Sequence, residues 1–277
     1  MLVLAGHAVQ AVSVGGLETC VQFPGLDLAF DIGRCPRSAV QRSRVLFTHA
    51  HLDHMGGIAM HAATRALTGL EPPLYLVPAE VVPDLEALMG TWRRLDRSRL
   101  PCRIVPCRPG DTLPLGRDLE VRAYRPDHVV PSVGYALWSR KHRLKAEYRD
   151  LPGPAIRDLR YAGTPVTEEV WTPDLAVPGD TRIDLFDREP ALLDARLLVL
   201  EATFLDDRVT VAQCREKGHV HLDEIAARAD DFRNQAILLV HFSARYAPAE
   251  VRALIDQRLP PDLRRRVTPL LPRGRDA

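Results

Sequence analysis

The hydrophobic and polar positions along the chain form short blocks, and glycine and proline separate many of them. Alternating or continuous apolar runs predict strands over residues 9–14, 18–23, 26–32, 44–48, 73–77, 103–105, 119–124, 134–138, 197–201 and 236–242. Apolar residues at helical spacing predict helices over residues 58–67, 79–95, 222–232 and 251–259, the last of these the final helix. Strand-rich halves flanked by helices indicate two stacked sheets with helices outside, an αββα sandwich.

The pattern predicts one domain over residues 1–277, because no repeat or linker interrupts it. In the helix over residues 79–95 the apolar side would consist of Val82, Leu85, Leu88 and Met89. Residues 129–179 are interpreted as strand, helix and loop, and the prolines of the segment Pro152-Gly153-Pro154 indicate a loop-rich insert.

Composition narrows the class of protein only moderately. Hydrophobic residues make up 46% and charged residues 26% of the 277 residues, as in ordinary soluble globular proteins. The 37 basic and 36 acidic side chains nearly cancel, so an RNA partner would need a local basic patch. Five cysteines without a pairing motif favour a reducing compartment over a disulfide framework. Without a basic leader or a membrane-length apolar window, we expect a cytoplasmic protein with no membrane partner.

The segment Thr48-His49-Ala50-His51-Leu52-Asp53-His54 is the most informative in the chain, and it directly follows an apolar run. Imidazole nitrogens suit zinc, and a carboxylate suits zinc or a second hard contact. A histidine-rich surface turn is the alternative, but the spacing H-x-H-x-D-H before Gly56-Gly57 favours a metal site. Through this motif the chain resembles the metallo-β-lactamase superfamily.

A dinuclear site needs further ligands, and strand ends are where they are expected. His128, Asp180 and His241 each follow a predicted strand or an apolar run, although each alone would more often be structural. We expect the first zinc to be held by His49, His51 and His128, the second by Asp53, His54 and His241, with Asp180 bridging them. Two such zinc ions can share a hydroxide that is nucleophilic at neutral pH and can clamp a phosphoryl oxygen.

Three later segments discriminate within the superfamily. Residues 200–207, 218–222 and 241–246 occur in an order that closely resembles ribonuclease Z, in its short, plant-type form. The resemblance extends through residues 29–36, 63–65, 132–135 and 233–239, nearly the whole chain. It implies an endoribonuclease that cuts precursor tRNA after the discriminator nucleotide, leaving a 3′-hydroxyl on the tRNA and a 5′-phosphate on the trailer. It also implies a homodimer, for which the helix over residues 79–95 is our candidate interface.

The resemblance also implies catalytic roles. Glu201 and His219 match the family's pair that protonates the departing 3′-oxygen, with Glu201 orienting and His219 donating. On residue type alone they could equally be a strand-end surface acid and a helix-start residue. Asp53 is assigned to the metal and to catalysis, while Ser243 and Arg245 are candidate phosphate contacts.

One departure from the family concerns tRNA capture. Many short enzymes of this family grip the tRNA elbow with a long Gly/Pro-rich arm between the equivalents of His128 and Asp180. Residues 129–179 are expected to leave no room for an arm of that length, so another surface would replace it. The strongest basic runs are residues 139–145 and 93–99, and such runs are often only solvated faces.

The leading hypothesis is therefore a zinc-dependent endoribonuclease that removes the 3′ trailer from precursor tRNA. The alternative keeps the same dinuclear site in a phosphodiesterase acting on small or cyclic nucleotide esters. Hydrolysis of lactams, lactones or thioesters is disfavoured, because acyl transfer needs no proton-donor pair such as Glu201 and His219. A non-catalytic RNA-binding relative is disfavoured because no ligand position is missing.

Overall fold

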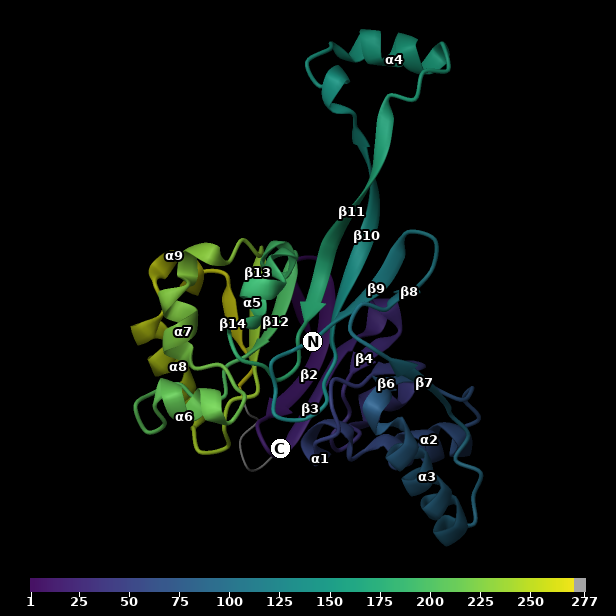
Figure 1. The fold of residues 1–277 in the computed structure, drawn as a ribbon, viewed down its shortest axis with the longest axis vertical. Coiled ribbons are helices and arrows are strands. Elements are labelled where there is room, and N and C mark those ends of the chain that lie inside the picture. Colours follow the sequence, from purple (N-terminus) through teal and green to yellow (C-terminus); the bar gives the residue numbers. More distant parts are fainter. Residues whose placement is uncertain (272–277) are drawn as a thin grey trace.

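In the computed structural model, which describes residues 1–271, the chain forms two seven-stranded sheets that pack face to face (Figure 1). In spatial order, the first sheet contains β1 (Leu2–Leu4), β2 (His7–Val14), β3 (Glu18–Phe23), β4 (Leu28–Phe30), β5 (Arg44–Leu46), β6 (Leu74–Pro78) and β7 (Arg103–Cys107). The second contains β14 (Val267–Pro269), β13 (Ala236–Val240), β12 (Leu197–Glu201), β11 (Thr167–Val177), β10 (Gly134–Leu144), β9 (Leu119–Tyr124) and β8 (Thr112–Pro114).

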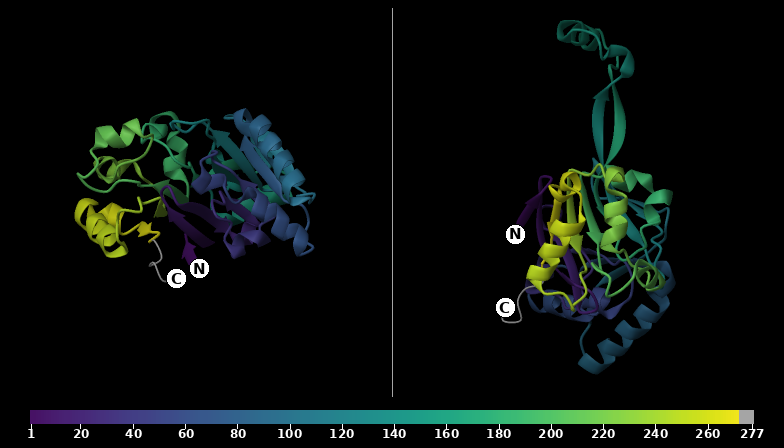
Figure 2. Two further views of the ribbon diagram at one scale, coloured as in Figure 1. Left: turned by 90° about the horizontal axis from the view of Figure 1, so that it is seen from below. Right: turned by 90° about the vertical axis from the view of Figure 1, so that its left-hand side faces the viewer.

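Helices lie outside both sheets (Figure 2). The α-helices are α1 (Leu52–Met55), α2 (Ile58–Leu67), α3 (Val82–Asp96), α4 (Gly153–Tyr161), α5 (Leu185–Arg188), α6 (Val211–Glu216), α7 (Leu222–Ala227), α8 (Pro248–Arg258) and α9 (Pro261–Arg264). Short 3-10 turns are η1 (Pro24–Leu26), η2 (Arg37–Gln41), η3 (Ala79–Val81), η4 (Ala146–Tyr148), η5 (Pro190–Asp194) and η6 (Ala229–Asp231).

Three apolar layers hold these elements together. Successive residues of a strand point to opposite faces, so Val45 of β5 packs against α2 and α3, whereas Leu46 packs between the sheets. In β12, Val199 likewise faces the other sheet, whereas Leu200 belongs to the layer under α5, α7 and α8. Burial on both faces explains the continuous apolar runs of the central strands. This layering confirms the predicted αββα sandwich.

Parallel strands gather the site at one edge. The strands β4 to β7 are parallel to one another, and so are β11 to β14. Their carboxyl ends therefore lie at a common edge of each sheet, where connecting loops meet. His49 lies beyond β5, Asp180 beyond β11 and His241 beyond β13, while Glu201 is the last residue of β12.

An extended arm formed by β10, α4 and β11 projects from the body (Figure 1). Residues 129–179 were expected to leave no room for an arm as long as the family's, so the expectation that a surface other than an arm lies here is corrected. The strands β10 and β11 pair antiparallel along their length, from Tyr135↔Val177 to Leu144↔Thr167, and α4 lies at the tip. Beyond the sheet a two-stranded ribbon is solvated on both faces. Its strands therefore lack the apolar alternation on which the prediction depended, and β11 was not predicted.

Other differences concern short or exposed elements. The predicted helix over residues 222–232 is divided into α7 and η6, and α9 follows the helix that was expected to be the last. The strands β1, β8 and β14 have three residues each, which is too short for a periodicity to be recognised. On α3, Leu85 and Met89 are buried as predicted, but Leu88 is 51% exposed.

The single domain over residues 1–277 stays a prediction, and its residues 272–277 lie outside the described part. Within residues 1–271, no helix combines the length and the apolar character needed to cross a bilayer.

Candidate metal centre

The histidine loop follows β5 and runs directly into the short helix α1. Its His49 and His54 are buried, while His51 and Asp53 are half-buried. The glycines after α1 allow this helix to pack on the backbone that leaves β4. A Cβ at Gly57 would lie only 2.3 Å from the carbonyl oxygen of Ile32, so a side chain there would displace the loop.

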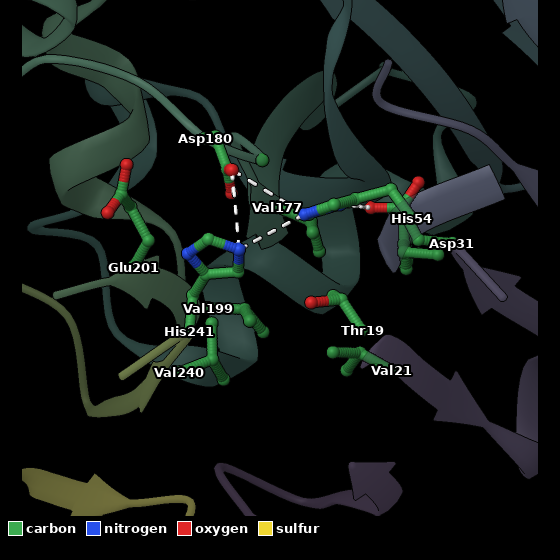
Figure 3. A pocket seen from close by; sticks show the side chains of 12 residues that line it. Thr19, Val21, Asp31, His54, Val177, Asp180, Val199, Glu201, Val240 and His241 are labelled. Carbon is green, nitrogen blue, oxygen red and sulfur yellow. Dashed lines mark hydrogen bonds and ion pairs between the residues drawn. The ribbon is translucent and has the colours of Figure 1, made fainter. Parts of the chain in front are cut away.

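The predicted ligands gather into two adjoining groups. In each group, one ligand atom per residue lies within 4.8 Å of the others, and the groups are His49, His51, His128 and Asp180, then Asp53, His54 and His241. The Asp180 carboxylate contacts both groups. Its Oδ2 is 3.8 Å from Nε2 of His49 in the first group. It is 3.5 Å from Nε2 of His54 and 3.4 Å from Nε2 of His241 in the second group (Figure 3). Clustered imidazole and carboxylate ligands of this kind define a metal-binding site.

One side chain that the site prediction missed, Asp31, orients two of these histidines. Its Oδ2 accepts hydrogen bonds from His54 Nδ1 and from the Thr48 hydroxyl, each 2.8 Å long. The same hydroxyl lies 3.0 Å from His49 Nδ1, so Asp31 acts on His49 through Thr48. With Nδ1 engaged, Nε2 of each ring is directed toward the cluster. The signal in the sequence was an aspartate just beyond an apolar strand.

His128 is held by a different loop. Its Nδ1 donates to the carbonyl oxygen of Gly218 at 2.9 Å, while its buried Nε2 has no hydrogen-bond partner among the described residues. A buried polar atom without a partner is costly unless something binds it. This orphaned nitrogen, next to His49 and His51, fits the role of a metal ligand.

The pKa shifts within the cluster determine which side chains are charged before a cation binds. Burial raises the pKa of Asp180, but His241 and His54 more than offset this and hold it well below the ordinary value. Burial and the neighbouring His54 lower the pKa of His49, which keeps its imidazole neutral. Burial also lowers the pKa of His54, yet Asp180 and Asp31 raise it well above its ordinary value. Metal binding would displace that proton, so affinity should depend on pH.

The predicted proton-donor pair lies beside the cluster. Glu201 is buried, and its Oε1 accepts from His219 Nδ1 at 2.9 Å and from the Thr181 N–H at 3.0 Å. Its Oε2 accepts from the Thr203 hydroxyl at 2.6 Å. Burial lowers the pKa of His219, but the Glu201 carboxylate outweighs it and raises this pKa to about 9. His219 is therefore protonated at neutral pH, and its Nδ1 lies 3.8 Å from the Asp180 carboxylate.

Another residue absent from the site prediction, Thr203, joins the pair to the ligand cluster. Its Oγ1 lies 2.8 Å from His241 Nδ1 and 3.3 Å from His219 Nδ1. The glutamate, the two histidines and the threonine thus form one hydrogen-bonded network. Next to it, Asp180, Glu201 and His241 border an internal cavity of about 20 Å³ between the sheets (Figure 3).

The candidate phosphate contacts lie just beyond β13. The Nε of Arg245 donates to the hydroxyl of Ser243 at 3.1 Å, and the exposed guanidinium lies over the Phe204 ring, with its carbon 5.4 Å from the ring centroid. Ser243 therefore fixes the direction of Arg245. Asp53, predicted for both metal and catalysis, accepts from the Gly16 N–H at 2.8 Å and lies 3.3 Å from His241 Nε2.

Comparison with known proteins identifies the class first. A family model described as "Beta-lactamase superfamily domain" matches residues 28–242. Among solved structures, the metallo-beta-lactamase fold protein YhfI from Bacillus subtilis has a TM-score of 0.65 at 15% identity, over 95% of this chain and 96% of that one. The short form of human tRNase Z has a TM-score of 0.60 at 19% identity, over 86% and 93% of the chains. At these identities the structures establish the fold.

Sequence relatives identify the family within that class. The chain is 41% identical to tRNase Z TRZ1 of Arabidopsis thaliana, over 95% of each chain. It is 38% identical to the chloroplastic tRNase Z TRZ2 of the same plant, over 91% of this chain and 72% of that one. A ribonuclease Z of Halobacterium salinarum is 32% identical, over 79% and 78%. The chain therefore belongs to the beta-lactamase superfamily and, within it, to the tRNase Z family.

Proposed function

We propose that this protein is a zinc-dependent endoribonuclease that removes the 3′ trailer from precursor tRNA. The observation that carries the proposal is the contact between His219 and Glu201 directly beside the ligand cluster. A proton donor held there serves a reaction with a poor leaving group, such as a sugar 3′-oxygen. The relatives named tRNase Z and ribonuclease Z support the same substrate.

The donor set fits two zinc ions. One ion would be held by His49, His51 and His128, the other by Asp53, His54 and His241, with Asp180 shared. The Nε2 of His128, which has no hydrogen-bond partner within residues 1–271, supports this fit. When bound, two zinc ions supply a nucleophilic hydroxide near neutral pH and neutralise charge on the phosphoryl group.

Other side chains of the protein would protonate the leaving group and bind the substrate. The carboxylate of Glu201 holds Nδ1 of His219, so the proton on Nε2 is the one that can pass to the departing 3′-oxygen. Thr203 and the Thr181 N–H keep that carboxylate in place. Arg245, fixed by Ser243 at the rim, would bind a phosphate oxygen of the substrate.

The arm is our candidate for tRNA capture. It presents Arg140, Lys141, His142 and Arg143 on β10, with Arg157 and Arg160 on α4 at the tip. Arg140 already pairs with Asp118 and Glu169, and Arg157 lies 3.6 Å from Asp158. The other basic residues of the arm are our candidates to meet phosphates. The tip also carries Tyr161, 85% exposed, which can stack on a base.

The geometry of the arm favours a homodimer. The strands β10 and β11 meet the metal loops at their Gly134/Val177 ends, and the arm continues from their opposite ends. Each strand has 11 residues. At about 3.3 Å per residue, such a strand spans roughly 36 Å. We therefore propose that each arm serves the active site of the partner subunit. The candidate interface is the exposed face of α3, where Leu88, Trp92 and Leu95 lie at helical spacing.

We also propose a reducing, cytoplasmic location. Cys20, Cys107 and Cys214 are buried free thiols, and Cys35 and Cys102 are free and half-buried. Free thiols in all five positions suit a compartment that keeps cysteines reduced. Fractionation of the native cells with detection of the protein would check this location.

The function is tested by incubating the zinc-loaded protein with end-labelled precursor tRNA and mapping the cut. We expect a single cut after the discriminator nucleotide, leaving a 3′-hydroxyl on the tRNA. A chromogenic aryl phosphodiester is assayed in parallel. Hydrolysis of the aryl ester without cleavage of precursor tRNA would reject the proposal in favour of a phosphodiesterase of small nucleotide esters.

The dimer is tested by light scattering and by mixing subunits. One subunit has residues 143–168 replaced by Asn-Gly, a two-residue hairpin turn that keeps the His142↔Glu169 pair. The other keeps its arm but carries His219→Ala. If arms act across the interface, the mixture regains cleavage that neither homodimer shows. A monomer at micromolar concentration, or a mixture as inactive as its components, would contradict the proposal.

A further inference from the structure

Arg182 occupies an unusual position, because its side chain connects three of the loops that build the site. It follows the ligand Asp180 by two residues, after β11. Its Nη1 contacts Asp127 Oδ1 at 2.7 Å, and its Nε donates to the carbonyl oxygen of Arg215 at 2.5 Å. The side chain is 26% exposed and contacts no predicted ligand in the described structure.

The first contact holds the loop of a metal ligand. Asp127 immediately precedes His128, and its carbonyl oxygen accepts from the Arg182 N–H at 3.0 Å. Its own N–H donates to the Thr181 hydroxyl at 2.9 Å. The segment before His128 is thus bound to residues 181–182 by two backbone-directed hydrogen bonds and one ion pair. Together these contacts restrict the position of the His128 ring.

The second contact holds the loop of the proton donor. The carbonyl of Arg215 lies in the last turn of α6, and it also accepts from the Gly218 N–H at 3.0 Å. A cation that bonds the last carbonyls of a helix is well placed, because these carbonyls lack helical partners. Gly218 has φ +77° and is followed directly by His219. The turn bound by Arg182 therefore sets the position of the His219 backbone.

The two loops also contact each other. The carbonyl oxygen of Gly218 accepts from His128 Nδ1, and a Cβ at Gly218 would lie 2.8 Å from that nitrogen. A small shift of the turn would therefore move both the ligand ring and the donor. Arg182, in the loop that contains Asp180, holds both of these loops in place.

We propose that Arg182 is a positioning residue that fixes His219 relative to the loop of His128. The proposal rests on the proposed function, since it concerns the donor for that cleavage. A guanidinium fits this role because its N–H groups diverge in a fixed plane and reach a carboxylate and a carbonyl at once. A lysine ammonium keeps the positive charge but places it on a single nitrogen atom. The partly exposed ion pair with Asp127 contributes little to the free energy of folding, so its value lies in geometry.

The test uses Arg182→Lys and Arg182→Met in the zinc-loaded full-length protein. We expect cleavage of precursor tRNA by Arg182→Met to fall in kcat by roughly 10–10²-fold, because catalysis is sensitive to displacements near 1 Å. KM for precursor tRNA and the zinc content should stay unchanged. An aryl phosphodiester with an activated leaving group needs no proton donor, so its hydrolysis should change by less than about threefold. Arg182→Lys should behave like Arg182→Met, only less severely.

Arg196→Lys is the matched control. Arg196 is 37% exposed, and its guanidinium likewise joins a carboxylate, that of Asp174 at 2.9 Å, to a backbone carbonyl, that of Ala5, away from the ligand loops. Its replacement should change neither the cleavage of precursor tRNA nor the hydrolysis of the aryl ester. Equal losses on both substrates in Arg182→Met, or no loss on either, would overturn the positioning role alone. A wild-type protein that hydrolyses the aryl ester but not precursor tRNA would overturn the proposed function, and this role with it.

Discussion

At the scale of single residues, the proposed proton donor His219 is part of a buried network rather than of an isolated pair. Glu201 accepts hydrogen bonds from His219, Thr203 and the backbone of residue 181. Buried carboxylates are stable only when such partners satisfy them, so the network sets both the charge and the direction of His219. The consequences for catalysis can be separated by the choice of leaving group.

Replacement of either member of the pair should slow the natural reaction selectively. We expect His219→Ala and Glu201→Ala each to reduce precursor tRNA cleavage by roughly 10²–10⁴-fold, the usual contribution of a positioned acid. The double variant should lose little more than the worse single variant, because the two act as a unit. Zinc content and hydrolysis of an activated aryl ester should remain near wild type. Equal losses on both substrates would mean that the pair positions the substrate or the metal.

The pH dependence follows from the same contact. Glu201 raises the pKa of His219 to about 9 against the effect of burial, and a general acid works only while protonated. Bound metal ions would lower the pKa of His219. Cleavage of precursor tRNA should therefore decline as the pH rises, and the decline should begin at pH 9 or lower. The decline approaches tenfold per pH unit when the acid is essential. The measurement is kcat against pH for both substrates, and an aryl ester profile that declines in parallel would assign the limb to another group.

At the scale of elements, α2 is anchored by a buried histidine that has no part in the chemistry. His61 lies 2.8 Å from the hydroxyl of Tyr75 on β6 and 3.0 Å from the carbonyl oxygen of Ala39 on η2. It therefore joins the helix to the sheet beneath it and to the turn beside it. Burial lowers the pKa of His61 to about 4, with a smaller effect of Arg65 in the same direction.

Acid should weaken this anchor. The folded-state pKa lies below the unfolded value, so the stabilisation is present above pH 6.5 and is lost as pH falls toward 4. Between pH 7 and pH 5 the loss should be about 2 kcal/mol in the free energy of unfolding. His61→Gln, which does not titrate, should lose less over the same interval. Urea denaturation of both proteins in excess chelator measures the difference; identical pH slopes would show that His61 is not the group responsible.

At the scale of the whole molecule, the candidate metal site joins the two sheets. His49, His51, Asp53 and His54 come from the loop after β5 in the first sheet, whereas His128, Asp180 and His241 come from loops of the second sheet. Metal ions bound between them would tie the layers together. Ions that bind only the folded state stabilise it in proportion to their binding free energy.

Metal removal should therefore lower both activity and stability. We expect close to two zinc equivalents per subunit, a lower Tm after chelation, and recovery of both on adding zinc. Asp180→Ala should remain folded but bind less zinc, show a smaller change of Tm on chelation and lose precursor tRNA cleavage, because Asp180 lies between the two groups. Asp174→Ala, which removes a partner of His7 and Arg196 outside the site, is the control. Metal analysis giving one equivalent or none, or a fully active Asp180→Ala, would contradict the dinuclear assignment.

Sequence by itself determined the fold class, the family and most of the candidate site. Apolar runs in the sequence predict the buried strands. The spacing H-x-H-x-D-H is rare enough to predict a metal-binding loop from His49 to His54. The resemblance of residues 200–207 and 218–222 to family motifs predicted Glu201 and His219. These features are local along the chain, which is why a sequence reveals them.

Only the tertiary structure decided which distant groups touch and where the arm lies. Asp31, Thr203 and Arg182 act through contacts between loops far apart in sequence. Asp31 has only its place after an apolar strand as a signal, and Thr203 and Arg182 carry no pattern that distinguishes them from surface residues. The arm between Gly134 and Val177 was missed for a related reason. Its strands are paired to each other but solvated on both faces, so hydrogen bonding across the ribbon, rather than burial of an apolar face, defines them.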